Sequence, residues 1–440
     1  MKNSSCAFSA KPVYAPLQGD VVVPGDKSIS HRAIMFASLA QGRSVITGLL
    51  QGDDVLATLS VFRAMGVKIT IGNHEVIVDG VGMSGLVQPN EVLYLGNSGT
   101  SARLLTGLFS GLNMTVVFSG DQSLNSRPMS RVIKPLRAMG ANMVAMHDKH
   151  LPLAILPNGG LQGIDYVSPI ASAQLKSSLL LAGMFAKGKT TLVEPAITRD
   201  HTERMLAAFG YPVRAHKNAS EIEGGHRLQP ISLAIPGDLS SAAFLLVAAS
   251  IVPDSELIIR DVGVNPTRIG VLNILKKMGA DITQENNRMF GQEPVADLRV
   301  RSSQLQGVVI DETDVSLAID EFPVLFIAAA CAKGQTVLQG AEELRVKESD
   351  RIQVMADGLQ DVGIQVSVQS DGMIIEGGII DGGRVKSHHD HRVSMSFAVA
   401  SLVSRKPIII EECENVSTSF PGFVALVNGL GFSIEETEHV

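Results

Sequence analysis

The sequence predicts an α/β fold built from six βαβαββ units, three in each of two lobes. Two observations predict it. A helix that ends in glycine before a β-prone run recurs six times, and a more apolar helix precedes it each time. The 440 residues suffice for two or three domains, and 45% hydrophobic with 18% charged residues is an ordinary globular balance.

Six glycines mark the expected ends of the outer helices. They are Gly66, Gly140, Gly210, Gly279, Gly363 and Gly431. Glycine readily takes the left-handed conformation in which a helix ends before the chain turns into a strand. We therefore expect an outer helix before each glycine and a strand after it.

An inner helix and a short strand precede each outer helix. The inner helices are expected at 29–40, 102–112, 174–185, 242–249, 323–332 and 394–403, and the strands at 44–47, 115–119, 190–193, 256–260, 336–339 and 407–411. Because these helices are apolar nearly all round, they should lie inside, enclosed by the sheets and the outer helices.

A repeated turn marks the boundary between the lobes. Pro236-Gly237-Asp238 repeats Pro24-Gly25-Asp26 without the cations that follow the earlier turn. We therefore expect 21–234 to form one lobe, and 1–20 plus 235–440 to form the other.

Composition excludes several classes of function. A net charge of −7 without a basic tract argues against nucleic acid as a partner. The apolar runs are too short to span a membrane, and the first 20 residues lack a signal-peptide core. Three cysteines, far apart in the sequence, fit neither a disulfide framework nor a zinc site, so we expect a cytoplasmic protein.

The start of the first inner helix suggests an anion site. Asp26 or Ser28 can cap this helix, and Lys27 and Arg32 lie in its first turns. Free backbone N–H groups and two cations favour phosphate or carboxylate there. The alternative is a capped surface helix with two solvated charges.

Three further segments of the first half have similar chemistry. They are the turn Gly96-Asn97-Ser98-Gly99-Thr100, the helix start Ser172-Ala173-Gln174, and the isolated cations Arg127 and Arg199. Glycines allow close approach of backbone to a ligand, and hydroxyl and amide groups can bind phosphate. Taken alone, Ser172 is better explained as a simple N-cap.

The second half adds acids as well as cations. Asp320-Glu321 precedes an inner helix, where such acids are usually caps, and Lys347 to Arg351 could be a solvated charge cluster. His388-His389-Asp390-His391-Arg392 has the composition of a metal site but no separate ligand at suitable spacing, so we expect no metal. Together, the cations of both halves suggest a cleft between the lobes that binds ligands with several anionic groups.

One motif matches a nucleotide-binding pattern but does not have the expected structural context. Residues 183–190, GMFAKGKT, match the P-loop pattern. A P-loop joins a strand to a following helix, whereas here a helix is expected before the motif and a strand after it. We therefore interpret it as a helix-to-strand turn.

Five motifs occur in order along nearly the whole chain. They are Pro24 to Arg32, Leu95 to Thr100, Ser126 to Met129, Leu344 to Arg351, and Asp390-His391-Arg392. In this order they resemble the 5-enolpyruvylshikimate-3-phosphate synthase (EPSP synthase) family. The resemblance implies a two-lobed inside-out α/β barrel. It also implies transfer of the enolpyruvyl group of phosphoenolpyruvate to the 5-hydroxyl of shikimate 3-phosphate, with no cofactor and a monomeric enzyme.

The resemblance also implies roles for individual residues. Those for shikimate 3-phosphate are Lys27, Ser28, Arg32, Ser172, Ala173, Gln174, Arg199, Asp320 and Lys347. Those for phosphoenolpyruvate are Lys27, Asn97, Gly99, Thr100, Arg127, Gln174, Glu348, Arg351, His391 and Arg392. Asp320 would be the base on the hydroxyl, and Glu348, assisted by Lys27, would protonate the methylene carbon.

Two departures from the patterns of the family's branches bear on inhibition. Thr418 stands where that branch has a lysine, so one phosphoenolpyruvate contact is missing or replaced. Other motifs are similar to the glyphosate-insensitive branch, whose members often have alanine at the position of Gly99. With glycine there, we expect glyphosate to compete with phosphoenolpyruvate.

Two alternatives remain. The related transferase acting on UDP-N-acetylglucosamine has a reactive cysteine on a loop of the first-half lobe, but 21–234 contain no cysteine. A non-catalytic ring or scaffold of repeats would not need Asp320 and Glu348 among cations.

Overall fold

The computed structural model describes residues 5–439, which divide between two compact units. The first unit comprises the chain up to Pro24, Gly237–Arg288 and the chain from Pro294 onward. The second unit comprises Gly25–Pro236 and a short segment, Met289–Glu293. The chain passes from one unit to the other after Pro24 and after Pro236, a few residues beyond the expected bounds at 20 and 234.

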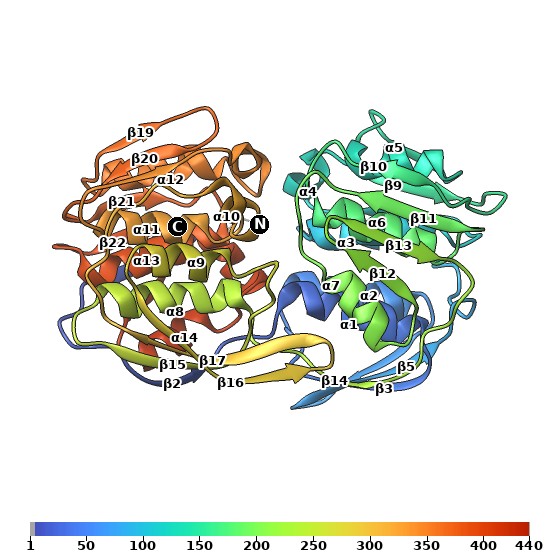
Figure 1. Cartoon of the computed structure of the whole chain (residues 1–440), viewed down its shortest axis with the longest axis horizontal. Coiled ribbons are helices and arrows are strands. Elements are labelled where there is room, and N and C mark those ends of the chain that lie inside the picture. The colour runs from blue at the N-terminus through green and yellow to red at the C-terminus, as the bar shows by residue number, and fades with distance from the viewer. Residues whose placement is uncertain (1–4, 440) are drawn as a thin grey trace. The chain divides into compact units, whose positions relative to one another are not determined.

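The second unit encloses three inner helices. These are α1 (Lys27–Leu39), α3 (Gly99–Ser110) and α6 (Ala173–Gly183). The remaining helices of this unit are α2 (Asp53–Ala64), α4 (Gln122–Ser126), α5 (Ser130–Ala138) and α7 (His201–Ala208) (Figure 1). The inner helices are buried along almost their whole length, whereas the longer outer helices bury one face, as the sequence predicts.

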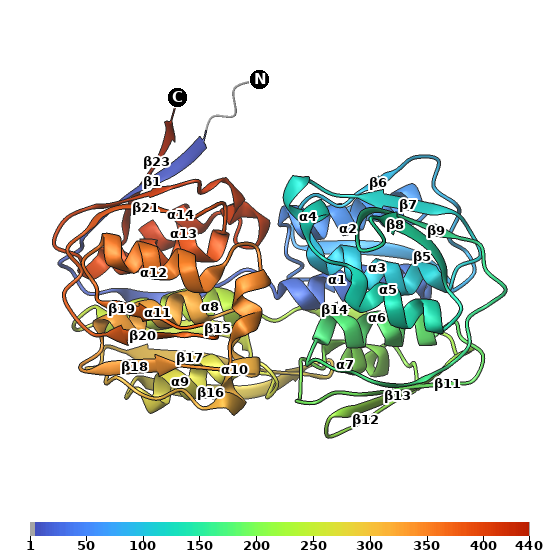
Figure 2. The same ribbon diagram turned by 90° about the horizontal axis from the view of Figure 1, so that it is seen from above.

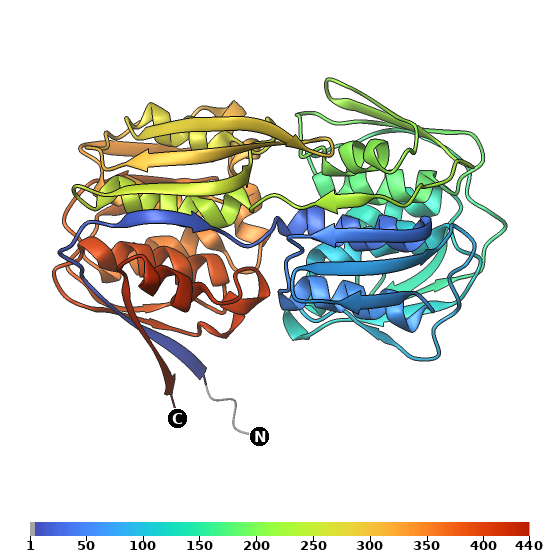
Figure 3. The ribbon, with the colours of Figure 1, turned by 90° about the horizontal axis from the view of Figure 1, so that it is seen from below.

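Three sheets of four strands complete this unit. Figure 3 looks onto one of them, in which β14 lies beside the blue strands β3, β5 and β4. Their orders are β14-β3-β5-β4, β6-β7-β9-β8 and β10-β11-β13-β12. The strands are β3 (Gln41–Thr47), β4 (Lys68–Ile71), β5 (Glu75–Val81), β6 (Leu93–Tyr94), β7 (Val116–Ser119), β8 (Asn142–Met146), β9 (His150–Leu156), β10 (Asp165–Val167), β11 (Lys189–Val193), β12 (Val213–His216), β13 (Ala219–Glu223) and β14 (Ser232–Ala234). Each sheet has one parallel pair followed by two antiparallel pairs.

The first unit repeats this plan. Its inner helices are α8 (Leu239–Ile251), α11 (Phe322–Cys331) and α13 (His391–Ala400). The other helices are α9 (Gly270–Lys277), α10 (Glu312–Leu317), α12 (Arg351–Asp361), α14 (Phe423–Gly429) and the 3₁₀ turns Glu342–Val346, Ser401–Val403 and Glu414–Thr418 (Figure 2). Each observed inner helix overlaps its predicted range, and this part of the prediction is confirmed.

The sheets of the first unit use strands from both ends of the chain. Their orders are β16-β17-β15-β2, β18-β20-β19 and β21-β22-β1-β23. The strands are β1 (Ser5–Lys11), β2 (Gln18–Val22), β15 (Glu256–Gly263), β16 (Asp281–Phe290), β17 (Glu293–Arg301), β18 (Gln335–Leu338), β19 (Val366–Val368), β20 (Met373–Glu376), β21 (Gly383–Lys386), β22 (Ile408–Glu411) and β23 (Ser433–His439). Within residues 5–439, six sheets and six inner helices give the predicted α/β fold of six units.

The hairpin of β16 and β17 corrects the expected domain bounds. Its tip, Met289–Glu293, counts with the second unit although both strands belong to a sheet of the first. Within that second unit the Glu293 carboxylate lies 2.8 Å from His201 Nδ1, at the start of α7. A contact so distant in sequence leaves no local pattern, so bounds drawn from repeats miss it.

The six repeat glycines all have the predicted conformation. Their φ angles lie between +75° and +108°, in the left-handed region that other residues rarely adopt. The P-loop-like segment also agrees with its interpretation, since α6 ends at Gly183 and β11 begins at Lys189. No helix in residues 5–439 is long and apolar enough to cross a membrane.

Replacing Gly140 tests the conformational role of these glycines. A Cβ there would meet only the Gly160 carbonyl oxygen at 3.7 Å, so the cost of Gly140→Ala arises from its φ of +99° rather than from crowding. We expect the free energy of unfolding to fall by about 1–2 kcal/mol in urea titration. Gly429→Ala is the control, because that helical glycine has open space and no positive φ. Equal effects of both substitutions would contradict the argument.

Candidate functional site

The start of α1 positions a cation against an acid from the next helix. Asp26 is the cap, and its Oδ1 accepts a hydrogen bond from the Ile29 amide at 2.8 Å. Lys27 Nζ lies 2.8 Å from Asp54 Oδ2, with side chains only 18% and 10% exposed. Asp54 was not among the predicted site residues, because two acids in the first turn of α2 have the pattern of ordinary helix caps.

Arg32 is buried rather than solvated. Its side chain donates to Thr202 Oγ1 and Ser177 Oγ, both at 2.7 Å, and to the Ser28 carbonyl at 2.8 Å. Burial lowers the pKa of Arg32 to about 10, opposed by the charge of Glu203, so the guanidinium remains charged at neutral pH. The alternative of two solvated surface charges is therefore wrong for this residue.

His31 is a neutral neighbour of these two cations. Burial, then the charges of Lys27 and Arg32, holds its pKa well below the usual range. Its Nδ1 lies 2.8 Å from Thr58 Oγ1. The positive charge at this helix start thus comes from Lys27 and Arg32 alone among these three residues.

The starts of α3 and α6 share hydrogen bonds around Gln174. Its Oε1 accepts from Arg103 at 2.8 Å and its Nε2 donates to Thr100 Oγ1 at 3.3 Å, which fixes the orientation of the amide. Arg103 was not a predicted ligand, although its place four residues after Gly99 puts it on the same helix face. Ser172 caps α6, since its Oγ accepts from the Leu175 amide at 3.4 Å.

Asn97 joins an acid and a second arginine in front of α3. Its Nδ2 donates to Asp121 Oδ2 at 2.7 Å, and its Oδ1 accepts from Arg127. Arg127 also donates to Ser123 Oγ at 3.1 Å. The predicted residues Asn97, Gly99, Thr100, Arg127 and Gln174 therefore belong to one connected region of the second unit.

A buried lysine supports the loop that carries Arg199. Lys176 Nζ lies 3.1 Å from Glu194 and 3.0 Å from Glu203, and all three side chains are at most 5% exposed. It also donates to the Thr198 carbonyl at 3.3 Å, next to Arg199. None of the three was predicted, because a single lysine inside an apolar helix gives no sign of its partners.

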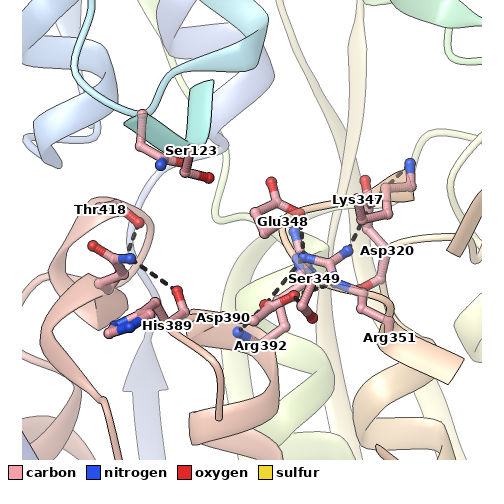
Figure 4. Close-up of polar contacts among 12 residues, drawn as sticks. Ser123, Asp320, Lys347, Glu348, Ser349, Arg351, His389, Asp390, Arg392 and Thr418 are labelled. Atoms are coloured by element: carbon pink, nitrogen blue, oxygen red, sulfur yellow. Dashed lines mark hydrogen bonds and ion pairs between the residues drawn. The ribbon is translucent and has the colours of Figure 1, made fainter. Parts of the chain in front are cut away.

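In the first unit, Asp320 lies beside two cations (Figure 4). Its Oδ1 is 3.4 Å from Lys347 Nζ and 3.5 Å from an Arg351 amino group. Lys347 also pairs with Glu343 at 3.1 Å. The structure thus brings together residues 27 positions apart that the sequence alone left as a cap and a charge cluster.

Arg351 is surrounded by carboxylates. Its side chain is 1% exposed and lies 2.8 Å from Asp390, 2.6 Å from Glu348 and 3.5 Å from Asp320. Burial alone would lower the pKa of Arg351, but these acids, Asp390 first, raise it above its usual value. Burial alone would likewise raise the pKa of Asp390, yet the Arg351 guanidinium keeps it below its usual value.

Arg392 connects α13 with the segment before α11. It donates to the Asp320 carbonyl at 2.9 Å, and its backbone amide donates to Asp390 Oδ1 at 3.0 Å. His391 is the first residue of α13 and is buried. No group of three or more His, Cys, Asp or Glu residues within 5–439 has the geometry of a metal site.

Thr418 uses its hydroxyl within its own turn. Its Oγ1 donates to the Asn415 carbonyl at 2.6 Å, and Asn415 donates to the His389 carbonyl at 2.8 Å. This turn is part of the first unit, and Thr418 is 9% exposed. The hydroxyl therefore fixes the 3₁₀ turn Glu414–Thr418.

Comparison with known proteins identifies the family. A family model described as EPSP synthase (3-phosphoshikimate 1-carboxyvinyltransferase) matches residues 13–426. The chain belongs to this family. It is 58% identical over 422 residues to a 3-phosphoshikimate 1-carboxyvinyltransferase of Halorhodospira halophila (95% of each chain), and 53% identical over 430 residues to one of Legionella pneumophila (98% of this chain, 99% of the other).

Comparison with solved structures identifies the same family. The structure of an EPSP synthase from Acinetobacter baumannii superposes with a TM-score of 0.90 at 51% identity, covering 99% of this chain and all of the other. The predicted fold, the family and the transferase activity are therefore confirmed. The comparisons do not support the UDP-N-acetylglucosamine alternative or the non-catalytic scaffold.

The Arg351–Asp390 pair predicts an acid-sensitive fold. Because the pKa of Asp390 is lowered in the folded state, its contribution to stability is present above pH 4 and is lost as the pH falls below it. We expect Asp390→Asn to lower the free energy of unfolding by about 3 kcal/mol at pH 7, since it removes one partner of a buried pair. The difference from the unsubstituted chain should shrink towards pH 3, as measured by urea denaturation. Asp357→Asn, at an exposed aspartate of α12, should change neither the free energy of unfolding at pH 7 nor its dependence on pH.

Proposed function

We propose that this EPSP synthase family member transfers the enolpyruvyl group of phosphoenolpyruvate to the 5-hydroxyl of shikimate 3-phosphate and releases phosphate. The observation that carries the proposal is a carboxylate, Asp320, held by Lys347 and Arg351, in a chain that places further cations, Lys27 and Arg392, at the starts of α1 and α13. Two anionic substrates need such cations, and removal of a hydroxyl proton needs a base.

The shikimate 3-phosphate ligands are proposed in both units. In the second unit, Ser172, Ala173 and Gln174 lie at the start of α6, where free amides favour phosphate. Arg199 lies in the loop that Lys176 supports. Lys27, Ser28 and Arg32 from α1, with Lys347 and Asp320 from the first unit, would orient the ring and its carboxylate.

The phosphoenolpyruvate ligands also come from both units. Arg127 and Arg392 offer guanidinium groups suited to bidentate contact with carboxylate or phosphate. The remaining proposed contacts are Lys27, Asn97, Gly99, Thr100, Gln174, Glu348, Arg351 and His391. The hydrogen bonds of Gln174 with Arg103 and Thr100 support its role, since they fix its amide before a ligand arrives.

The proposed chemistry is addition followed by elimination through a tetrahedral intermediate, without a covalent bond to the protein. Asp320 takes the proton of the 5-hydroxyl while Glu348, assisted by Lys27, delivers a proton to the methylene carbon. Both transfers reverse in the elimination step. The cations beside Asp320 favour its ionised form, which a base requires.

Asp320→Ala tests the assignment of the base. We expect the rate of phosphate release from phosphoenolpyruvate and shikimate 3-phosphate to fall by about a thousandfold, because general base catalysis contributes about 10²–10⁴. The fold should survive, as judged by circular dichroism. Asp311→Ala, at an exposed aspartate that pairs with Lys277, is the control. Phosphate release with UDP-N-acetylglucosamine but not with shikimate 3-phosphate would contradict the proposed substrate.

Gly99→Ala tests the steric argument on glyphosate. A Cβ at Gly99 would lie 2.9 Å from Arg103 Nη1 and 3.3 Å from Arg127 Nη1, so both guanidinium groups must shift. We expect the inhibition constant for glyphosate to rise about tenfold or more, equivalent to about 1.4 kcal/mol of binding. Gly159→Ala, in open space within the same unit, should leave it unchanged. An inhibition constant unaffected by Gly99→Ala would refute the argument.

We further propose that the chain acts in the cytoplasm as a monomer and without a cofactor. The cysteines of the described residues, Cys6, Cys331 and Cys413, form no disulfide, which supports a reducing compartment. Light scattering during turnover would measure the oligomeric state, and full activity after dialysis against chelator would test independence of metal.

A further inference from the structure

Glu321 lies at the N-cap position of α11, directly after the proposed base Asp320, but it does not act as a cap. Its side chain makes no capping hydrogen bond. It is instead 2% exposed, which is rare for an ionisable acid. The interpretation of this acid as an ordinary cap is therefore wrong, and its burial needs another explanation.

The Glu321 carboxylate lies between two guanidinium groups of the first unit. Its Oε1 accepts a hydrogen bond from Ser240 Oγ and lies 3.6 Å from Arg268 and 3.8 Å from Arg392. Its Oε2 accepts no hydrogen bond from any residue in 5–439. Arg268 is 3% exposed and also pairs with Asp238 at 3.1 Å.

This arrangement places guanidinium groups beside a buried carboxylate. Transfer of an unpaired carboxylate into the protein interior costs several kcal/mol, and nearby guanidinium groups offset that cost. Asp238 and Glu321 share Arg268, so Arg392 supplies the second positive charge of the cluster. Arg392 is thus held by a buried counter-ion on one side while its side chain stays 11% exposed.

Arg392 connects this cluster to the proposed site. The same amino group that faces Glu321 also donates to the Asp320 carbonyl at 2.9 Å. The consecutive residues Asp320 and Glu321 therefore both hold the Arg392 guanidinium. Asp320 does so through its main-chain carbonyl, and Glu321 through its carboxylate. From the other side, Lys347 and Arg351 hold the Asp320 carboxylate.

We propose that Glu321 is a positioning residue for phosphoenolpyruvate, which acts through Arg392, and that Arg268 and Ser240 hold its carboxylate in place. The inference rests on the proposed function, in which Arg392 binds phosphoenolpyruvate. Arg392 held in one orientation loses less conformational freedom when it binds an anion. The affinity for phosphoenolpyruvate therefore depends on Glu321, although Glu321 does not contact the substrate.

Glu321→Gln tests this role, because glutamine keeps the shape and can still accept from Ser240 but has no charge. We expect the KM for phosphoenolpyruvate to rise about tenfold, while the KM for shikimate 3-phosphate changes by less than about twofold. A merely structural role would lower kcat through a smaller active fraction and leave both KM values unchanged. Glu312→Gln, at an exposed glutamate of α10, is the matched control and should change neither KM.

Ser240→Ala keeps the test decisive if Glu321→Gln does not fold. It leaves every charge in place and removes only the hydroxyl that donates to Glu321. We therefore expect the KM for phosphoenolpyruvate to rise about threefold. An unchanged KM for phosphoenolpyruvate in the folded variants would overturn the inference. If the unsubstituted enzyme released no phosphate from these two substrates, the proposed function would fail instead, so the two failures are distinguishable.

Discussion

Burial of the six inner helices is the constraint on which the rest of the structure depends. Helices such as α8 and α11 are apolar on nearly every side, so each unit must surround them with three sheets and a layer of outer helices. Their apolar sides leave the helix ends as the places for polar groups. The free amides at the N-termini then favour anions, and cationic side chains placed there strengthen that preference.

Charges placed at these helix starts are partly buried, and several cations of the proposed site have nearby acids or hydroxyls. Lys27 pairs with Asp54, Arg32 donates to Thr202 and Ser177, and Arg351 lies among three carboxylates. Such partners fix the orientation of a side chain at the expense of part of its attraction for a ligand. This pre-organisation suits a transferase that must align two anionic substrates, because alignment lowers the entropic barrier to their reaction.

The sequence predicted the motifs of the site better than their supporting contacts. Lys27, Arg127, Asp320 and Arg392 lie in motifs at helix starts, where local pattern is informative. Asp54, Lys176, Arg268 and Glu321 have no such signal, because a buried acid or base is recognised only by the partner that folding brings to it. Glu321 shows the difference most clearly, since its position is that of a cap and its contacts are those of a buried ion pair.

By itself, the sequence determined the six-unit α/β fold, the inner and outer helices and the glycines that end the outer ones. These features depend on local periodicity and on backbone conformation, which the order of residues encodes directly. Only the tertiary structure decided which strands complete each sheet, that the tip of the β16–β17 hairpin counts with the second unit, and which acid neutralises which cation. Those features depend on contacts between residues as distant as Ser5 and His439, and no local pattern encodes a pairing across such a separation.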